Sequence, residues 1–236
     1  MHGLLKNRRL ISLLQFTAQR LHLPEPYIKP MLQLPVSIRI PQANEMAHRP
    51  DIDALLNKRS SANIVQGFTI TPNNTPQLPF KYYAAINVHN NKLWELFSAL
   101  TGMLPDEVSC VYGLHDDEPI TTGYFAKDYV LKVLQQYRIE LSQDGTLEFG
   151  LLFHTKDTLV ELFVTASKYI KFWGMDMDAF VKIMLDQEIP SKEQLEFVDE
   201  YPKIVEPLRD FIPSAKHPES VIHQLNIAFE VVKTHD

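Results

Sequence analysis

Apolar residues recur every three or four positions in several stretches of the chain, as they do along the buried face of a helix. The clearest case follows Asn90, where Leu93, Leu96, Phe97 and Leu100 share one helical face. On this pattern we predict helices over residues 3–22, 51–58, 90–104, 124–138, 176–186, 191–201 and 218–232.

Strands are predicted where apolar residues fall on alternate positions, because successive side chains of a strand point to opposite faces. Val108, Cys110 and Tyr112 show this alternation. A short strand over 139–141 is expected to form a hairpin with 147–149, because Asp144-Gly145 is a favoured hairpin turn. The other predicted strands cover residues 36–40, 63–71, 80–89, 107–114, 147–154, 159–165 and 169–173.

The order of these elements indicates the fold class. Strands dominate the middle of the chain and helices close it, which is typical of α+β proteins rather than of a regular βαβ alternation. We therefore predict an α+β fold with a mixed or antiparallel sheet packed by several helices, and with a helical C-terminal part. Residues 115–123 are polar and are predicted to form a loop.

Charge is distributed unevenly along the chain. Residues 1–60 contain nine Lys and Arg and four Asp and Glu, a net charge of +5, whereas residues 61–236 contain fourteen and twenty-five, a net charge of −11. We therefore predict a basic N-terminal helix and proline-broken segment over 1–60 and an acidic main domain over 61–236. An acidic domain disfavours nucleic acid and favours a basic protein partner. Acidity that serves solubility alone is the alternative.

The cysteine content and the absence of long apolar runs bear on localisation. The single cysteine, Cys110, cannot form an intrachain disulfide and favours a reducing compartment. No run of eighteen apolar residues occurs, so no membrane-spanning helix is expected. Ser12, Gln15 and Thr17 interrupt the apolar stretch near the N-terminus, which favours an amphipathic helix over a secretory signal. We predict a cytoplasmic protein.

Motifs that would identify a common enzyme class are absent from the sequence. There is no GxGxxG or GxxxxGK[ST] phosphate loop, no GxSxG nucleophile elbow and no HExxH metal motif. A single cysteine also excludes a CxxC zinc site. We therefore predict neither a metal nor a cofactor, and we favour a protein without enzymatic activity.

The densest polar group is His115-Asp116-Asp117-Glu118, between a predicted strand and a predicted helix. Its carboxylates could bind a hard cation, or one of them could act as a general base beside His115. The same loop could instead contact a protein partner, or be a solvated turn that caps the next helix. All four residues are candidate partner-binding residues.

A second acidic group consists of Glu193, Glu196, Asp199 and Glu200 on the helix predicted over 191–201. Spacings of three and four would place much of their charge on one exposed face, where a basic partner would relieve the repulsion. An ordinary solvated face is the alternative. These residues complete the set of candidate partner-binding residues.

Two further groups could have a function. His154 and Asp157 lie at a predicted hairpin tip, where a histidine beside a carboxylate can titrate near neutral pH. Tyr169, Phe172 and Trp173 form an aromatic group that could anchor a protein partner or belong to the core. For both groups the structural role, a polar turn or a core, is the simpler hypothesis.

Five strings carry a resemblance that covers about half of the chain. They are Leu-Trp-Glu-Leu-Phe at 93–97, Tyr-Gly-Leu-His-Asp-Asp at 112–117, Leu-Glu-Phe-Gly-Leu at 147–151, Glu-Leu-Phe-Val at 161–164 and Phe-Val-Asp-Glu-Tyr-Pro at 197–202. Together they resemble small, acidic bacterial α+β immunity proteins, which accompany polymorphic toxins. The resemblance implies a single-domain protein that neutralises a toxin by contact, and it assigns a role to no individual residue.

These observations favour a non-enzymatic protein-binding module, with immunity-like neutralisation of a basic partner as its role. The alternative is a hydrolase that uses scattered carboxylates and a histidine, His115 or His154. A third hypothesis is an oligomer formed through the N-terminal helix, although the sequence itself does not decide the oligomeric state.

Overall fold

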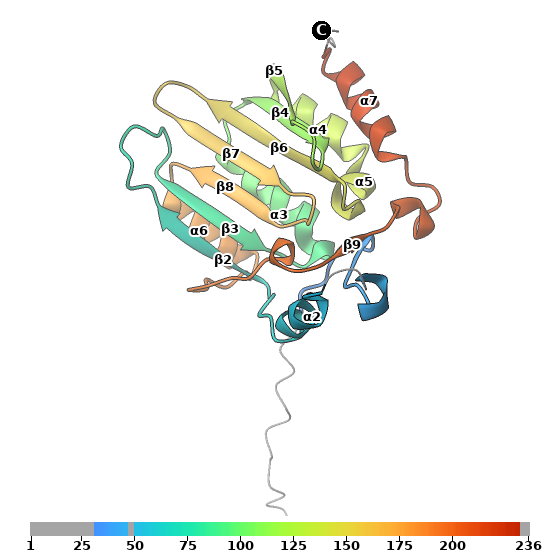
Figure 1. Ribbon diagram of the computed structural model, residues 1–236. Helices are drawn as coiled ribbons and strands as arrows, with labels where there is room; N and C mark the ends of the chain where they lie inside the picture. The colour runs from blue at the N-terminus through green and yellow to red at the C-terminus, as the bar shows by residue number, and fades with distance from the viewer. Residues whose placement is uncertain (1–30, 47–49, 232–236) are drawn as a thin grey trace, which may run out of the picture. The chain divides into compact units, whose positions relative to one another are not determined.

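A seven-stranded antiparallel sheet forms the centre of the fold (Figure 1). The computed structural model describes residues 31–46 and 50–231, and within them the strand order is β2-β3-β8-β7-β6-β4-β5. The predicted α+β class is confirmed, and of the two predicted sheet types the protein has the antiparallel one. The strands are β2 (Gly67–Pro72), β3 (Tyr82–Asn87), β4 (Glu107–Leu114), β5 (Ile120–Ala126), β6 (Leu147–His154), β7 (Leu159–Val164) and β8 (Ile170–Gly174).

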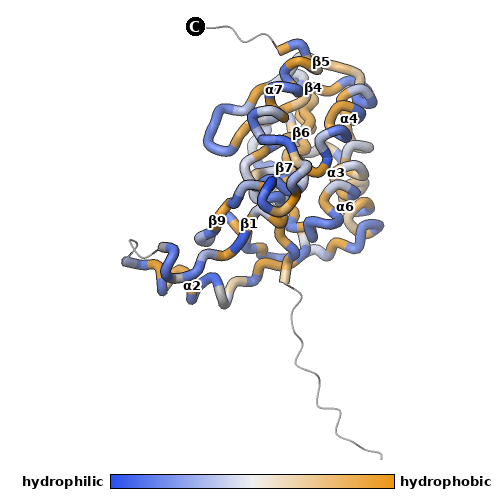
Figure 2. The backbone as a smooth tube through the Cα atoms, turned by 90° about the vertical axis from the view of Figure 1, so that its right-hand side faces the viewer, coloured by the Kyte–Doolittle hydropathy of each residue, from blue (hydrophilic) through white to orange (hydrophobic). Residues whose placement is uncertain are grey.

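Helices α3, α4 and α6 gather on one face of this sheet, whereas α2 lies on the side of β1 and β9 (Figure 2). Figure 2, turned by 90° from Figure 1, shows α3, α4 and α6 on one side of β6 and β7, with β1 and β9 on the other. Among the described residues, no helix is both long and apolar enough to cross a membrane. The helices are α2 (Ile52–Ser60), α3 (Leu93–Leu100), α4 (Lys127–Gln135), α5 (Arg138–Gln143), α6 (Met177–Asp186) and α7 (Pro218–Ala228).

The hydrophobic core lies between the sheet and these helices. Val160, Leu162 and Val164 of β7 face it at alternate positions, as strand geometry requires. The apolar face predicted for α3 is completely buried, and the Phe97 ring of this helix lies 5.0 Å from the Phe149 ring of β6. At the end of the helix layer, α7 packs on β4. The strands and helices thus pack against each other through the apolar faces that the sequence pattern indicates.

A second, two-stranded sheet joins the start of the described chain to its C-terminal third. Strand β1 (Ile38–Arg39) pairs antiparallel with β9 (Ile204–Val205). The Arg39 guanidinium binds Glu206 at 2.8 Å, which reinforces this pairing. Residues 1–30, including the helix predicted over 3–22, lie outside the described residues, and the predicted domain boundary at residue 60 stays a prediction.

The β2–β3 hairpin is joined to the other five strands of the main sheet by a ladder between distant parts of the sequence. Strand β3 pairs with β8, so that Ile86 lies opposite Ile170. By contrast, β6, β7 and β8 follow one another along the chain and pair as neighbours. The β2–β3 hairpin is therefore attached to the other five strands by a contact that spans much of the chain.

The helix predicted over 191–201 is wrong. Ser191 instead bridges to Phe68 at the edge of β2, and the chain continues in an extended form to a short 3₁₀ turn at Val198–Glu200. The reason lies in the backbone pairing, since Phe68 donates to the Pro190 carbonyl at 3.0 Å and accepts from the Lys192 amide at 2.8 Å. The Pro190 carbonyl and the Lys192 amide are thus paired with the edge of the sheet, and they are not available for hydrogen bonds within a helix.

The prediction around residues 115–149 is wrong in two places. Residues 139–141 belong to α5 rather than to a strand, because Leu134, Tyr137 and Leu141 continue one buried helical face. The Asp144-Gly145 turn therefore joins a helix to β6. Strand β5 begins inside the loop predicted over 115–123, since it is an edge strand with exposed polar and glycine residues and lacks an apolar alternation.

Candidate functional site

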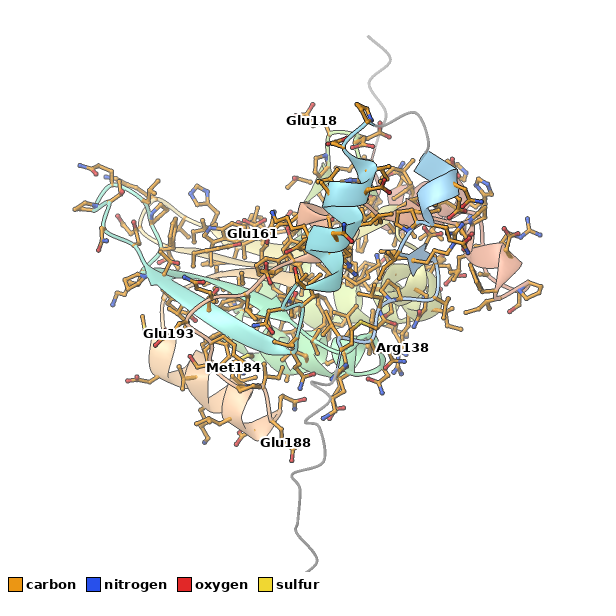
Figure 3. All side chains as sticks on the ribbon, turned by 60° about the horizontal axis from the view of Figure 1, so that its bottom comes forward. Glu118, Arg138, Glu161, Met184, Glu188 and Glu193 are labelled. Atoms are coloured by element: carbon orange, nitrogen blue, oxygen red, sulfur yellow. The ribbon has the colours of Figure 1, made fainter. Side chains whose placement is uncertain are left out.

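The candidate site is the face of the main sheet opposite to the helices, which we call the uncovered face. It carries alternate residues of the central strands, among them Tyr83 on β3, Glu161 and Phe163 on β7, and Trp173 on β8, all half-buried. Figure 3 shows Glu161 and the core residue Met184 on opposite sides of the sheet. Within the described chain, helices α3, α4, α5 and α6 pack on the other face, so none of these four helices covers these side chains.

Tyr83, Trp173 and Glu161 form a row across three adjacent strands. Tyr83 lies opposite Trp173 in the β3–β8 register, and their ring centroids are 4.9 Å apart. Glu161 lies opposite Trp173 on the other side. Burial raises the pKa of the Tyr83 hydroxyl, and burial also raises the pKa of Glu161, although nearby Lys171 opposes the second effect. An incompletely solvated carboxylate beside aromatic rings is a favourable contact point for an added cation.

The row continues toward Tyr169, which immediately precedes β8. The Lys171 ammonium lies 5.7 Å from the centroid of the Tyr169 ring, and that ring lies 4.6 Å from the Phe197 ring. Phe163 lies opposite Lys171 on β7. Phe197 belongs to the extended segment after Pro190, which runs along this end of the sheet (Figure 1). Aromatic surface thus extends from Trp173 to the boundary formed by this segment.

A polar cluster lies at this end of the uncovered face and consists of His115, Glu148, Ser167, Asp199 and Lys203. His115 Nδ1 is 3.4 Å from Glu148 Oε1. Ser167 Oγ donates to Asp199 Oδ1, and Lys203 Nζ donates to both of these oxygens. Burial acts to raise the pKa of Asp199, but the hydrogen bonds from Lys203 and Ser167 and the nearby His115 outweigh it and lower the pKa.

Lys168 lies next to this cluster in the turn between β7 and β8. Its backbone has φ 63°, a left-handed conformation, and the residue is only 3% exposed. Its Nζ donates to the Leu147 carbonyl at 2.6 Å, which ties the turn to the start of β6. Burial lowers the pKa of this ammonium to about 7, against the opposing influence of Asp144 and Glu148. The group therefore changes its charge near neutral pH.

The structure separates the four residues of the loop at 115–118. His115 joins the polar cluster, and its Nε2 is also 3.6 Å from Oδ1 of Asp116, whose backbone has φ 76° and whose side chain is 91% exposed. Asp117 and Glu118 line a small cavity of about 230 Å³ against α7, together with His223. The loop therefore presents its side chains to different surroundings rather than to one site.

The second acidic group is also divided, because its predicted helix does not form. Glu196 accepts hydrogen bonds from the Asn63 amide and, at 2.6 Å, from the Tyr201 hydroxyl. Glu200 accepts from the Phe197 amide at 2.8 Å. Glu193 is exposed, and Figure 3 shows it in a different part of the molecule from Glu118. Of the eight predicted residues, the structure brings His115 close to Asp116 and Asp199, and it places Asp117 and Glu118 at one small cavity. A partner-binding role for the set stays a prediction.

The two candidate histidines lie at opposite ends of β6. The His115 amide donates to the Thr146 carbonyl, just before β6 begins, whereas His154 is the last residue of that strand. The strand rises by about 3.4 Å per residue, so its length separates the two histidines by roughly 24 Å. A catalytic site that combines His115 with His154 is therefore not formed.

The uncovered face is only partly visible in the sequence. Tyr169, Phe172 and Trp173 are close in sequence, but the strand period divides them, so that Phe172 is completely buried in the core while Tyr169 and Trp173 lie on the uncovered face. Sequence reasoning missed Glu161 and Lys171. The sequence signal for both is a charged residue inside an otherwise apolar strand. The residues before and after it face the core, so the charged residue itself faces the other side of the sheet.

Groups suited to metal or thiol chemistry are not gathered at this site. Among the described residues, no three His, Cys, Asp or Glu side chains are placed to hold a metal ion. Cys110 is completely buried in β4, and burial raises the pKa of its thiol. The chemistry that the uncovered face offers is aromatic contact and charge.

Comparison with known protein families, with curated proteins and with solved structures finds no match to this chain. Its function therefore has to be inferred from its own residues, above all those of the uncovered face.

Proposed function

We propose that this chain is a non-enzymatic protein-binding module whose uncovered face contacts a basic protein. The row of Tyr83, Trp173 and Glu161 carries the proposal. Tyrosine and tryptophan are the residues that most often dominate binding energy at protein interfaces, especially when they are packed and partly desolvated before binding. The ring pair is preorganised, since the two residues are fixed by the β3–β8 register.

Charge supports a basic partner. Glu161 already bears the cost of partial burial, which raises its pKa, so a Lys or Arg from a partner would stabilise the charged carboxylate. Glu148 and Asp199 place further carboxylates at the end of the same face. The net charge of −11 over residues 61–236 would speed encounter with a positively charged protein.

The resemblance to immunity proteins extends the proposal to the kind of partner. In that case the partner is a toxin, and binding to the uncovered face covers the surface that the toxin needs for activity. We place this interaction in the cytoplasm, in keeping with the single cysteine of the chain.

The hydrolase alternative, which would use scattered carboxylates and His115 or His154, has less support from the geometry, because the two histidines lie at opposite ends of β6. The polar cluster does not supply an accessible nucleophile either. Ser167 is 4% exposed, and its hydroxyl is engaged by both Asp199 and Lys203. His115 contacts Glu148 rather than this hydroxyl. A serine that is buried and whose hydroxyl already makes two hydrogen bonds is poorly placed to attack a substrate. These contacts therefore favour a structural role for the polar cluster.

The proposal is tested by co-purification from native lysate, followed by measurement of Kd with the isolated partner. We expect a stoichiometric basic protein whose Kd rises at least about tenfold for Trp173→Ala and for Glu161→Lys, a loss of about 1.4 kcal/mol that is typical of a significant interface residue. The matched controls are Leu185→Ala and Asp186→Lys, which change exposed residues on α6, on the opposite side of the sheet. Both controls should bind like the wild type.

Three results would contradict the proposal. One is the absence of any stoichiometric partner. Another is a partner whose affinity is unchanged by both substitutions on the uncovered face. A partner whose affinity falls as much with the two control substitutions as with these two would also contradict it. A toxin partner would in addition lose its activity when the wild-type chain binds and keep it in the presence of Trp173→Ala.

A further inference from the structure

A groove of about 640 Å³ lies outside the uncovered face, between the start of the described chain and α2. Its volume is within the range of about 300–1,000 Å³ that is typical of small-molecule sites. Most of its wall is apolar, from Leu32, Leu34, Ile40, Leu56 and Ile64. Such a wall favours the apolar part of a ligand.

Arg59 is the single charged residue among the described residues that line this groove. The residue is only 9% exposed, and its Nη1 atom is buried without a hydrogen-bond partner in the described part of the chain. The guanidinium lies 5.4 Å from the centroid of the Tyr201 ring, a contact that gives Nη1 no hydrogen-bond acceptor. Burial lowers the pKa of this group.

A buried cationic donor without an acceptor is unfavourable unless a ligand supplies one. No carboxylate in the described residues forms an ion pair with Arg59, whereas Arg39, which belongs to the same small sheet region, binds both Glu45 and Glu206. The unpaired donor therefore distinguishes Arg59 from an arginine that serves structure.

We infer that this groove binds a small amphipathic carboxylate, with its carboxylate on the Arg59 guanidinium and its apolar chain along Leu34, Leu56 and Ile64. The guanidinium presents planar, paired N–H donors that match the two oxygens of a carboxylate. The described residues of the groove offer no second cation, which suits a ligand with one negative charge. The groove is a different surface from the proposed protein contact, so its ligand would be additional to the protein partner.

The test is calorimetric titration of the full chain with octanoate, 1-octanol, octylammonium and acetate. Octanoate should bind at least about tenfold more tightly than the other three, because only octanoate has both the charge and the chain. Arg59→Met keeps much of the length of the side chain without its charge. It should weaken the binding of octanoate at least about tenfold, while the affinity for 1-octanol changes less than about twofold. Arg209→Met removes an exposed arginine elsewhere and should leave octanoate binding unchanged.

Two further variants keep the test decisive if Arg59→Met does not fold. Arg59→Lys should retain the preference for octanoate over 1-octanol, and Ala62→Phe, which fills the groove, should weaken both ligands. The inference is overturned if wild-type protein binds octanoate no better than 1-octanol or acetate. It is also overturned if folded Arg59→Met binds octanoate like the wild type.

Discussion

The Lys168 ammonium donates a 2.6 Å hydrogen bond to the carbonyl of Leu147, although Lys168 is almost completely buried. This contact joins the turn between β7 and β8 to the start of β6. It places an ionisable group where its charged form is poorly solvated, and burial lowers its pKa to about 7. The stability of the fold should therefore depend on pH in a defined direction.

Substitution of Lys168 by Met should remove part of this pH dependence. Between pH 7 and about 10.5 the unfolded chain holds a proton that the folded chain has released, so stability rises with pH through this window. The free energy of unfolding of the wild type, minus that of Lys168→Met, should increase by up to about 1.4 kcal/mol per pH unit. Urea unfolding of both proteins at pH values from about 6 to about 10 measures this difference in unfolding free energy.

The exposed Lys182 on α6 provides the control for this experiment, since Lys182→Met removes a lysine that is not buried. Its pH profile should run parallel to that of the wild type. If Lys168→Met also runs parallel, the buried lysine does not change its charge in this range.

Glu188→Gly should stabilise the protein. Glu188 has φ 56° and lies two residues after the end of α6, where its amide donates to the Leu185 carbonyl and the next amide, of Ile189, donates to the Met184 carbonyl. This hydrogen-bond pattern is the one in which glycine is preferred, because other residues are strained at positive φ. The Lys92 ion pair that would be lost is exposed and contributes little. We expect a gain of about 0.5–1 kcal/mol in denaturant unfolding.

The matched substitution is Glu193→Gly, at an exposed residue without positive φ. It should give no gain and should cost a few tenths of a kcal/mol, because glycine increases the entropy of the unfolded chain. Equal effects of the two substitutions would show that the φ of Glu188 is not strained.

Tyr112→Phe should weaken the attachment of α7 to the sheet. The Tyr112 hydroxyl on β4 donates to Asn226 Oδ1 on α7 at 3.0 Å, and both residues are buried. Removal of the hydroxyl leaves a buried amide oxygen without this donor, which should cost about 1–2 kcal/mol of unfolding free energy. Tyr124→Phe, at a half-exposed tyrosine that bonds the His154 carbonyl, should cost less than about 0.5 kcal/mol. Similar losses of unfolding free energy for the two variants would mean that burial does not determine the contribution of these hydroxyl groups.

Glu161→Gln should separate stability from binding. Burial raises the pKa of Glu161, so the native carboxylate is less favourable at neutral pH than an amide of the same size. At pH 7 the variant should be more stable by up to about 1 kcal/mol, and this advantage should vanish as pH falls below the ordinary glutamate pKa of about 4.3. Its affinity for a basic partner should fall at the same time. A loss of stability at pH 7 would indicate that the charged form is needed by the fold.

Local pattern predicted most of the sheet and helices because their signals lie within a few residues. Strand β4 and the buried face of α3 follow directly from the spacing of their apolar side chains. The extended segment after Pro190 could not be found in this way, because its form depends on Phe68 in β2, more than a hundred residues earlier. Pairing with a distant sheet edge overrides a local helical pattern.

The candidate site depends on strand order as well as on strand positions. The alternation in β7 and β8 separates Glu161 and Trp173 from the core residues, yet it does not place them beside Tyr83. That contact exists only because β3 lies next to β8. Arg59 illustrates the same limit, since its sequence neighbours give no sign that Tyr201 covers its guanidinium.

The ladder between β3 and β8 also has a consequence for how the chain reaches its fold during synthesis. The β2–β3 hairpin leaves the ribosome long before residues 170–174, so its inner edge has no partner while the intervening segment is made. An unpaired strand edge is a site for aggregation. Newly made chains truncated before β8 should therefore depend on chaperones far more than chains that extend beyond it.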